Sequence, residues 1–209
     1  MSRDPTSFVR GHYDRVAGRY DRLIRVPERL LFGDGRRWAA GQARGEVLEI
    51  AIGTGRNLPY YSADARLTGV DLSPGMLAIA RRRADGTKVD VRALRVADAQ
   101  HLPFDDASFD VLVATLAFCS IPDDTAAMTE AARVLRPGGT LILLEHVGSP
   151  VLVVRAVQRL LAPPALRVEG DHLLREPHRC VEAAGLHVGL LERSKLGIVM
   201  RLTAHKPTT

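Results

Sequence analysis

The chain has 209 residues, of which 46% are hydrophobic and 25% are charged. This length and composition predict a single globular domain over residues 1–209, and they exclude a disordered chain and a small scaffold that depends on disulfides. The formal charge of +5 is confined to residues 1–45, which hold ten arginines and five acidic residues, because the remaining 19 basic and 19 acidic residues cancel.

Residues 1–45 form the first predicted segment, which is basic and mostly helical. Pro27 is expected to divide residues 1–44 into separate helices, because proline lacks the amide hydrogen that a helix interior uses. Such a segment could attract anionic acceptors or the headgroups of a membrane, or it could be a solvated helix face in an arginine-rich proteome. Few aromatic residues accompany the arginines and no nucleic-acid module is present, so we expect no nucleic-acid partner.

Residues 46–147 and 175–209 alternate between short apolar runs typical of strands and helical patterns. The predicted strands lie at 47–52, 67–72, 91–97, 109–119, 140–145, 186–192 and 197–204, and the predicted helices at 76–84, 123–135 and 176–184. This alternation predicts βαβ units around a buried parallel sheet. Only four residues separate the last two strands, so the final strand should be antiparallel. The expected fold is therefore α/β, a Rossmann-like sheet of seven strands with helices on both faces.

Residues 148–174 interrupt this alternation and predict a helical cap. One face of the predicted helix is apolar and consists of Val153, Val154, Val157, Leu160 and Leu161, and the opposite face consists of Arg155, Gln158 and Arg159. Two interpretations stay open for the apolar face: it lines a pocket for a lipophilic molecule, or it packs against the sheet. Pro163 and Pro164 are expected to end this helix.

Glycines and a carboxylate follow the first two strands, where open α/β sheets bind ligands. Gly53 and Gly55 indicate either a nucleotide-binding loop or only a tight turn between strand and helix. Asp71 ends the second strand, where an acid would bind ribose hydroxyls; the alternative is a helix N-cap. Leu58 stands where a dinucleotide-binding loop has its third glycine, and Glu49 would repel a pyrophosphate. The loop therefore favours a cationic sulfonium or ammonium nucleotide over NAD.

Four segments of the chain follow one another in the order and spacing of a known family. They are residues 47–57 (VLEIAIGTGRN), 69–77 (GVDLSPGML), 97–110 (ADAQHLPFDDASFD) and 132–145 (ARVLRPGGTLILLE). They resemble the motifs of class I S-adenosylmethionine-dependent methyltransferases, and with residues 13–21 (YDRVAGRYD) they are similar to the ubiquinone/menaquinone C-methyltransferase group. The resemblance implies S-adenosylmethionine as the methyl donor and S-adenosylhomocysteine as the product.

The resemblance also implies a role for each matched residue. Gly53, Thr54 and Gly55 would pass beneath the methionine moiety and ribose, and Glu49 would organise the methionyl amino group. The ribose, adenine and sulfonium would be held by Asp71, Leu72, Met76, Asp98, Ala99, Thr115 and Leu116, and Tyr20, with Tyr13, would close over the cofactor as part of a lid formed by residues 1–45. The family usually has glycine where this chain has Ala51, which makes a direct contact from Ala51 less secure than the others.

The acceptor side is less defined by the sequence. Methyl transfer from a sulfonium is an in-line displacement that needs no metal, and a base is required only for some acceptors. The candidate catalytic residues are His146, Asp171 and His172. The alternative for His146 is a partly exposed loop histidine, and the alternative for Asp171 and His172 is a turn and helix cap before the helix at 176–184. Glu145 also ends the fifth strand. Cys119 is interpreted as a small buried apolar side chain.

The C-terminal segments 170–175 (GDHLLR) and 191–207 are similar to small bacterial phospholipid N-methyltransferase-like proteins and to thiol methyltransferases. The predicted function is therefore methyl transfer to a small, lipophilic acceptor. The alternatives are a sensor or scaffold protein that binds S-adenosylmethionine without turnover, and a phospholipid N-methyltransferase at a membrane surface.

Cysteine usage and the termini complete the expectations. Cys119 and Cys180 stand alone, without a CxxC pair or a cluster at metal-ligand spacing, so we expect no disulfide framework and no metal site. The start of the chain lacks the apolar region of a signal peptide, and the longest predominantly apolar run, 111–119, is far shorter than the ~20 residues of a membrane span. We therefore expect a cytoplasmic protein.

Overall fold

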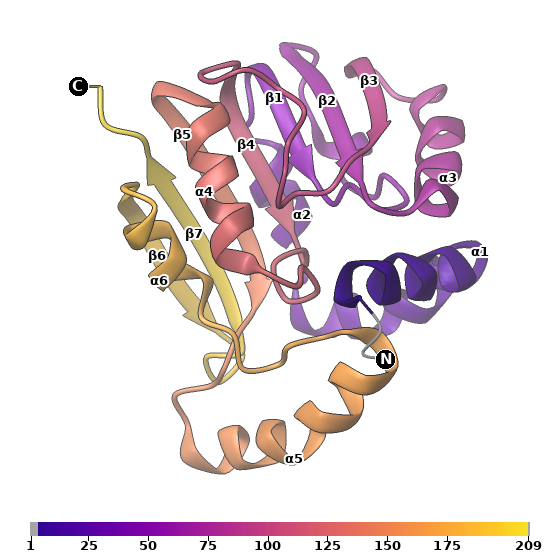
Figure 1. Ribbon diagram of the computed structural model, residues 1–209, viewed down its shortest axis with the longest axis vertical. Coiled ribbons are helices and arrows are strands. Elements are labelled where there is room, and N and C mark those ends of the chain that lie inside the picture. Colours follow the sequence, from indigo (N-terminus) through magenta and orange to yellow (C-terminus); the bar gives the residue numbers. More distant parts are fainter. Residues whose placement is uncertain (1–3, 209) are drawn as a thin grey trace.

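A computed structural model describes residues 4–208 of the chain (Figure 1). The helices are α1 (Pro5–Leu31), α2 (Gly35–Ala40), α3 (Pro74–Ala84), α4 (Asp124–Val134), α5 (Leu152–Glu169) and α6 (Pro177–Ala183), with a short 3-10 helix η1 (Leu58–Tyr60). The strands are β1 (Gly45–Ile50), β2 (Ala65–Asp71), β3 (Asp90–Val96), β4 (Phe109–Thr115), β5 (Leu135–His146), β6 (His187–Ser194) and β7 (Val199–His205).

The strands form a single sheet of seven in the order β3-β2-β1-β4-β5-β7-β6. Strands β1 to β5 pair in parallel, and β7 runs antiparallel to both β5 and β6. The predicted α/β fold with an antiparallel last strand is confirmed. Strand order reverses between β1 and β4, so the loops that follow these two strands diverge at the carboxyl edge of the sheet and leave room for a ligand there.

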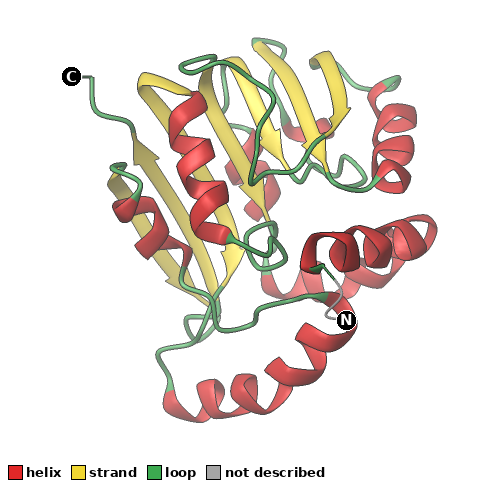
Figure 2. Cartoon of the chain, viewed as in Figure 1, coloured by secondary structure: helices red, strands yellow, loops and turns green. Residues whose placement is uncertain are grey.

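Helices cover both faces of the sheet (Figure 2). Successive residues of β1 point to opposite faces, as in any strand. Leu48 packs in the apolar cluster that contains Met128 of α4, whereas Val47 packs in the cluster that contains Leu77 of α3. Burial on both faces explains why these strands read as nearly continuous apolar runs in the sequence.

The predicted helix breaks at prolines are wrong. Helix α1 continues through Pro27, and α5 continues through Pro163 and Pro164. A proline in a helix leaves the carbonyl of the residue four positions earlier without its amide partner. Those positions include Leu23 and Leu160, which are exposed, so water can hydrate the freed carbonyls.

Two strand boundaries also differ from the prediction. The run 109–119 stays a strand only to Thr115, because Leu116 takes a left-handed backbone with φ 55°. Strand β5 begins at Leu135 rather than at residue 140, since Leu135 already pairs with Phe109. Phe109 pairs with Leu135 and Val111 pairs with Thr140, so the register shifts between them. This shift accommodates Gly138 and Gly139 of β5.

The apolar face of α5 is oriented differently from both expectations. Four of its five residues (Val153, Val157, Leu160 and Leu161) are between 51% and 77% exposed. The buried residue of this helix is the polar Gln158. The apolar face therefore neither lines a pocket nor packs on the sheet. Among residues 4–208, no helix is long and apolar enough to cross a membrane.

Candidate functional site

A cleft lies at the carboxyl edge of the sheet, at the reversal between β1 and β4. Its walls come from α1, α2, the loops after β1, β2, β3 and β4, and the start of α3. Eleven of the thirteen residues predicted to bind the cofactor line it: Tyr20, Ala51, Gly53, Thr54, Asp71, Leu72, Met76, Asp98, Ala99, Thr115 and Leu116. The tertiary structure thus brings together residues that are up to 96 positions apart in the sequence.

Asp71 is fixed in the cleft wall by two backbone amides. Its Oδ2 accepts a hydrogen bond from the Gly53 amide at 2.8 Å, and its Oδ1 accepts one from the Ser73 amide at 2.8 Å. Burial raises the pKa of the Asp71 carboxyl to about 6, although both amides act in the opposite direction. The alternative role as a helix N-cap is wrong, because Ser73 caps α3 and accepts from the Met76 amide at 3.1 Å.

The turn after β1 depends on left-handed backbone conformations. Gly53 and Gly55 have φ values of 59° and 76°, and Ala51 has φ 51°. A side chain on Gly53 would meet only the Ala51 carbonyl, at 3.9 Å, so the space beside Gly53 is open. Gly55 does not line the cleft; a side chain there would collide with Leu58. The left-handed φ also explains why glycine is usual where this chain has Ala51.

Glu49 is the other predicted residue that does not line the cleft. Its carboxylate is 1% exposed and accepts hydrogen bonds from Asn57 Nδ2 and Tyr61 Oη, both at 2.8 Å. Burial raises the pKa of this carboxyl to about 7. Glu49 therefore acts on the cleft through Asn57, which lies between it and Thr115.

Helix α1 forms one wall of the cleft through Val9, Tyr13 and Tyr20. Tyr13 Oη hydrogen-bonds Ser120 Oγ at 2.7 Å, which ties the helix to the loop after β4. Burial raises the pKa of Tyr20 to about 12, so its hydroxyl stays protonated. The segment predicted to be a lid thus lies against the predicted cofactor residues.

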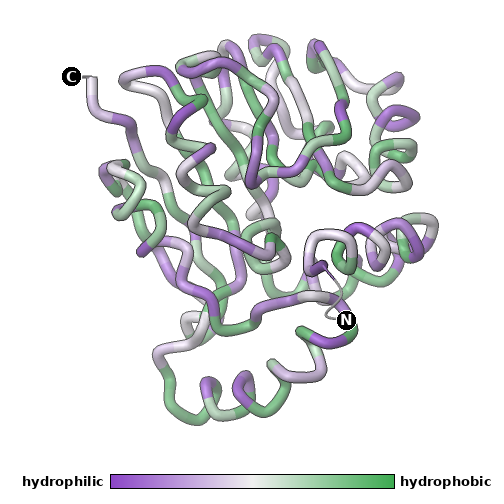
Figure 3. Tube along the Cα trace, in the orientation of Figure 1, coloured by the Kyte–Doolittle hydropathy of each residue, from purple (hydrophilic) through white to green (hydrophobic). Residues whose placement is uncertain are grey.

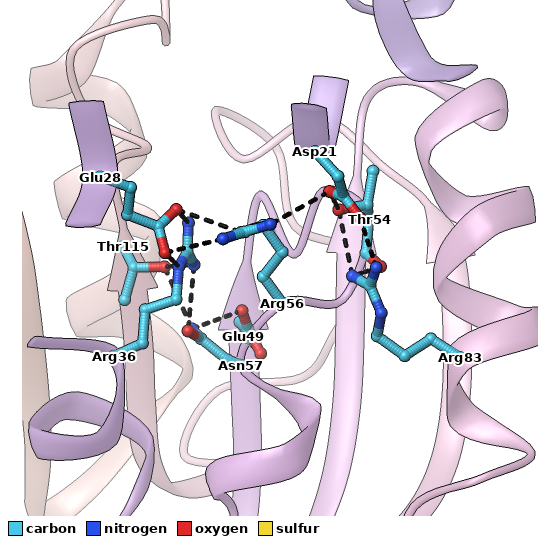
Figure 4. Close-up of polar contacts among 9 residues, drawn as sticks. All are labelled: Asp21, Glu28, Arg36, Glu49, Thr54, Arg56, Asn57, Arg83 and Thr115. Carbon is cyan, nitrogen blue, oxygen red and sulfur yellow. Dashed lines mark hydrogen bonds and ion pairs between the residues drawn. The ribbon is translucent and has the colours of Figure 1, made fainter. Parts of the chain in front are cut away.

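A charged cluster that the sequence analysis did not identify holds α1 in this position (Figure 4). Arg36 of α2 donates from Nε and Nη2 to the two oxygens of Glu28, at 2.8 and 2.9 Å. Arg56 donates to the same carboxylate twice, at 3.1 Å. The remaining Arg36 nitrogen, Nη1, donates to Asn57 Oδ1 at 3.0 Å and to Thr115 Oγ1 at 2.9 Å.

The contacts in this cluster keep the Glu28 carboxyl in its charged form. Burial alone would raise the pKa of Glu28, but the hydrogen bonds from Arg36 and Arg56 outweigh it and lower that pKa. Arg36 lines the cleft and is 9% exposed. No local signal distinguishes Arg36 from the other arginines of residues 1–45, since its partners lie far away in the sequence.

A second set of polar contacts joins α1 to the glycine turn, also drawn in Figure 4. Asp21 Oδ1 accepts a hydrogen bond from Thr54 Oγ1 at 2.6 Å, and Asp21 also forms an ion pair with Arg83 of α3. Arg83 donates in addition to the Thr54 carbonyl. Asp21 and Glu28 thus fasten two successive parts of α1 over the cleft.

Two of the candidate catalytic residues, His146 and Asp171, lie next to Cys119 of the loop after β4. His146 Nε2 lies 3.0 Å from Asp171 Oδ1, and the ligand atoms of Cys119, His146 and Asp171 all lie within 4.8 Å of one another. Burial opposes protonation of His146, but Cys119 and Asp171 outweigh it and raise the pKa of the imidazole well above its usual value. Cys119 is buried, as expected, and burial raises the pKa of its thiol.

The other two acceptor-side candidates lie around this cluster. Glu145 is fully buried, accepts from the Ala117 and Phe118 amides, and has a pKa raised by burial to about 7. The backbone of His172 donates to the Cys119 carbonyl at 2.8 Å. His172 and Asp171 line a second cavity, which is open to solvent, with Ala162, Pro163 and Leu166 of α5.

The cluster of Cys119, His146 and Asp171 offers sulfur, nitrogen and oxygen donors, the ligand types that Zn²⁺ accepts. Residues 119, 146 and 171 are too far apart in the sequence for a spacing motif. The expectation that cysteine and histidine do not cluster therefore held for the linear sequence, but not for the folded chain.

Comparison with known proteins places this site in a family. A family model of the methyltransferase domain matches residues 48–143. The matched region contains the second and third motifs in full. It contains the first motif except for residue 47 and the fourth except for residues 144–145.

Individual relatives carry different acceptor names. Phosphatidylethanolamine N-methyltransferase of Cereibacter sphaeroides is 38% identical over 119 residues, which are 56% of this chain and 59% of that protein. Demethylmenaquinone methyltransferase of Thermus thermophilus is 38% identical over 148 residues, 66% of each chain. Thiol S-methyltransferase TMT1A of Homo sapiens is 28% identical over 169 residues, 79% of this chain and 69% of that one. The chain spans about three fifths to two thirds of the first two relatives.

The fold has solved counterparts. A methyltransferase chain from a complex with the Trm112 methyltransferase activator of Haloferax volcanii superposes with a TM-score of 0.75 at 20% identity. The match covers 93% of this chain and 97% of that one. At this identity the likeness establishes the fold, which the sheet order had already indicated.

Proposed function

The chain belongs to the S-adenosylmethionine-dependent methyltransferase family through residues 48–143, and from that membership we propose that it transfers a methyl group from S-adenosylmethionine to a small lipophilic acceptor. The observation that carries the proposal is the cleft at the β1/β4 reversal, around which eleven of the predicted cofactor residues gather. A second cavity is lined partly by apolar residues of α5 and also by Asp171, which lies 3.0 Å from His146.

The residues of the cleft fit this cofactor. Asp71 is a buried carboxylate with free lone pairs for the two ribose hydroxyls, and the open space beside Gly53 admits a ligand close to the backbone. Leu72 and Met76 would cover the adenine, with Asp98 and Ala99 beside its amino group. Tyr20 would close the cleft from α1.

Arg36 gives the cleft a positive charge for the methionine carboxylate. Its guanidinium lines the cleft and is held rigid by Glu28 and Thr115. Its Nε and Nη2 already donate to Glu28, so Arg36 would attract the methionine carboxylate by charge, because Arg36 and Arg56 together carry two positive charges against the single negative charge of Glu28. We assign Glu49 a positioning role, in which it orients Asn57 toward Arg36 and Thr115.

The acceptor would enter through the second cavity. Its apolar part consists of Ala162, Pro163, Leu166, Leu173 and Leu174. Relatives named for a phospholipid, a quinone and a thiol acceptor support a lipophilic molecule, with the methylated atom left open. In this proposal residues 148–174 are the cap of that cavity, residues 46–147 the cofactor core, residues 1–45 the lid, and residues 175–209 the edge of the sheet.

The chemistry requires alignment more than acid–base catalysis. The sulfonium supplies an activated methyl group, so the bond to the acceptor forms as the bond to sulfur breaks, and no metal is required. His146 would accept the proton that an amine, thiol or activated carbon acceptor loses, and Asp171 would orient its ring and stabilise the resulting cation. Alignment of this kind supplies several kcal/mol of a barrier, of the order of 7 or more in well-oriented systems.

The test is a screen with radiolabelled S-adenosylmethionine over thiols, amines, phenols, quinones and phospholipids, preceded by calorimetry. We expect S-adenosylmethionine and S-adenosylhomocysteine to bind, NADH and ATP not to compete, and one acceptor class to take up label. Tight NADH binding would overturn the cofactor. Cofactor binding without transfer to any acceptor would favour a sensor or scaffold protein.

The metal-free mechanism is tested separately with a chelator. Activity should survive exhaustive treatment with EDTA, and Cys119→Ser should leave it unchanged within a few-fold. Loss of activity on chelation, restored by Zn²⁺, would instead assign Cys119, His146 and Asp171 as metal ligands.

A further inference from the structure

We propose that the outer faces of α5 and α1 dock on an anionic lipid bilayer. This inference does not rest on methyl transfer, because it concerns a surface outside the cleft. It commits to a lipid surface on two grounds: aliphatic side chains that the fold leaves uncovered, and arginines that the fold leaves without carboxylate partners.

Helix α5 turns an apolar face to the solvent. Its most exposed large residues are Leu152, Val153, Val157, Leu160, Leu161 and Val168, each at least half exposed. Figure 1 shows α5 at the edge of the molecule away from the sheet, and in Figure 3 its outer turns carry the hydrophobic colour. Monomeric soluble proteins rarely leave a contiguous apolar patch of this kind uncovered.

The buried side of α5 fixes this orientation. Gln158 Oε1 accepts a hydrogen bond from the Ser149 amide at 2.7 Å, and its Nε2 donates to the Val147 carbonyl at 3.0 Å. A polar side chain thus anchors the helix to the end of β5. Rotating the helix to bury Val157 and Leu160 would break these hydrogen bonds and leave buried backbone groups unpaired. The outward apolar face is therefore specified by the fold.

Helix α1 adds aliphatic and cationic side chains. Leu23, Val26 and Leu30 are between 56% and 66% exposed and recur at helical spacing. The arginines of the same outer surface are Arg15, Arg19, Arg22, Arg25 and Arg29, all exposed. Within residues 4–208, none of these five forms a salt bridge.

The acidic residues of these helices face inward or lie at an end. Between positions 15 and 31, the acids of α1 are Asp21 and Glu28, and both are paired with interior arginines. Helix α5 carries Arg159 and Arg167 on its exposed surface and has no acidic residue before Glu169. The outer surface of the two helices is thus cationic and aliphatic, the combination that binds anionic headgroups and inserts into the interface.

The two helices adjoin near the start of α1. They meet where Gly170, at the end of α5, packs against α1; a side chain on Gly170 would lie 2.8 Å from Val9. The second cavity opens beside the same helix, at Ala162, Pro163 and Leu166. Docking on this face places the mouth of that cavity at the lipid boundary, so a lipophilic molecule could reach Asp171 without crossing water.

The experiment is co-sedimentation of the full chain with vesicles of phosphatidylcholine alone and of phosphatidylcholine with phosphatidylglycerol, without cofactor. We expect binding to the anionic vesicles, weaker binding to the neutral ones, and a decrease at high salt. The variant V153S/V157S/L160S should bind vesicles at least about tenfold more weakly, because it removes the inserted side chains. The variant R22Q/R25Q should lose roughly tenfold on anionic vesicles only.

Matched controls use exposed residues elsewhere. Leu191→Ser on β6 and Arg179→Gln on α6 should bind vesicles like the natural chain, and calorimetric binding of S-adenosylmethionine reports that every variant is folded. The proposal is overturned if anionic vesicles do not bind the chain, or if V153S/V157S/L160S binds them equally well. It is also overturned if ultracentrifugation shows a dimer that the same serine substitutions dissociate, because the face would then be covered by a second copy.

Discussion

The Glu28 carboxylate of α1 receives two parallel hydrogen bonds from the Arg36 guanidinium of α2, at 2.8 and 2.9 Å, and both side chains are 11% exposed. This pair lies where α1 meets the cleft. Because Arg36 also donates to Thr115, this one side chain links α1 to the end of β4.

Glu28→Gln should destabilise the protein. The neutral amide leaves Arg36 and Arg56 without their carboxylate, and breaking a mostly buried pair from one side costs about 3 kcal/mol in the free energy of unfolding. Urea denaturation measures this loss. Asp34→Asn is the matched control, since Asp34 pairs with Arg201 at an exposed position, and should change stability by no more than about 1 kcal/mol. Equal effects of the two substitutions would show that the Glu28 pair has no special weight.

Deletion of residues 1–25 should abolish turnover while the remainder stays folded. The deletion removes Tyr13 and Tyr20 from the cleft and Asp21 from its contact with Thr54, but leaves Glu28 and the sheet intact. Label transfer and thermal unfolding are measured on the same preparation. A truncated protein with full activity would refute the lid.

Asp71→Ala should weaken binding of S-adenosylmethionine by about 1–3 kcal/mol, because two charge-assisted hydrogen bonds to ribose are lost. Isothermal titration measures the change, and Asp85→Ala, at the exposed end of α3, is the control. An unchanged affinity would remove Asp71 from the cofactor site.

The same carboxylate predicts how cofactor binding depends on pH. The pKa of Asp71 is raised to about 6, and only the ionised form accepts hydrogen bonds from both hydroxyls. Affinity should therefore be constant well above pH 6 and fall as the pH decreases through that value. In Asp71→Asn this fall should disappear; if it persists unchanged, another group titrates.

Asp171→Asn should shift the pH profile of turnover. Asp171 helps raise the pKa of His146, so its removal lowers that pKa, and the unprotonated base becomes available at lower pH. The acid limb of kcat should move to lower pH, and His146→Gln should lose that limb. A uniform decrease in kcat without a shift would mean that Asp171 has only a structural role.

Ala51→Gly should stabilise the protein by about 0.5–1 kcal/mol, because it relieves a left-handed alanine but increases the freedom of the unfolded chain. Ala107→Gly, at a similar φ of 53° outside the cleft, should give a comparable gain. Chemical denaturation measures both. A loss of stability in Ala51→Gly would contradict the strain at this turn.

Local patterns in the sequence determined the sheet and most residues that line the cleft. Strands buried on both faces must be apolar runs, and a turn with positive φ must carry glycine or bear strain, so the strand and turn at residues 47–57 can be predicted from the linear sequence. The carboxyl ends of parallel strands meet at one edge, which gathers Asp71, Asp98 and Thr115 without further information.

Only the tertiary structure decided the rest. Arg36 becomes a site residue because Glu28, Asn57 and Thr115 converge on it from distant positions. Helical periodicity defines the two faces of α5 but not which face is buried. The hydrogen bonds of Gln158 hold the polar face inward and leave the apolar face exposed. Helix α1 continues through Pro27. The residue whose carbonyl loses its amide partner is Leu23, which is exposed, so the lost hydrogen bond is tolerated. Partners distant in the chain set these outcomes, and a local pattern carries no information about them.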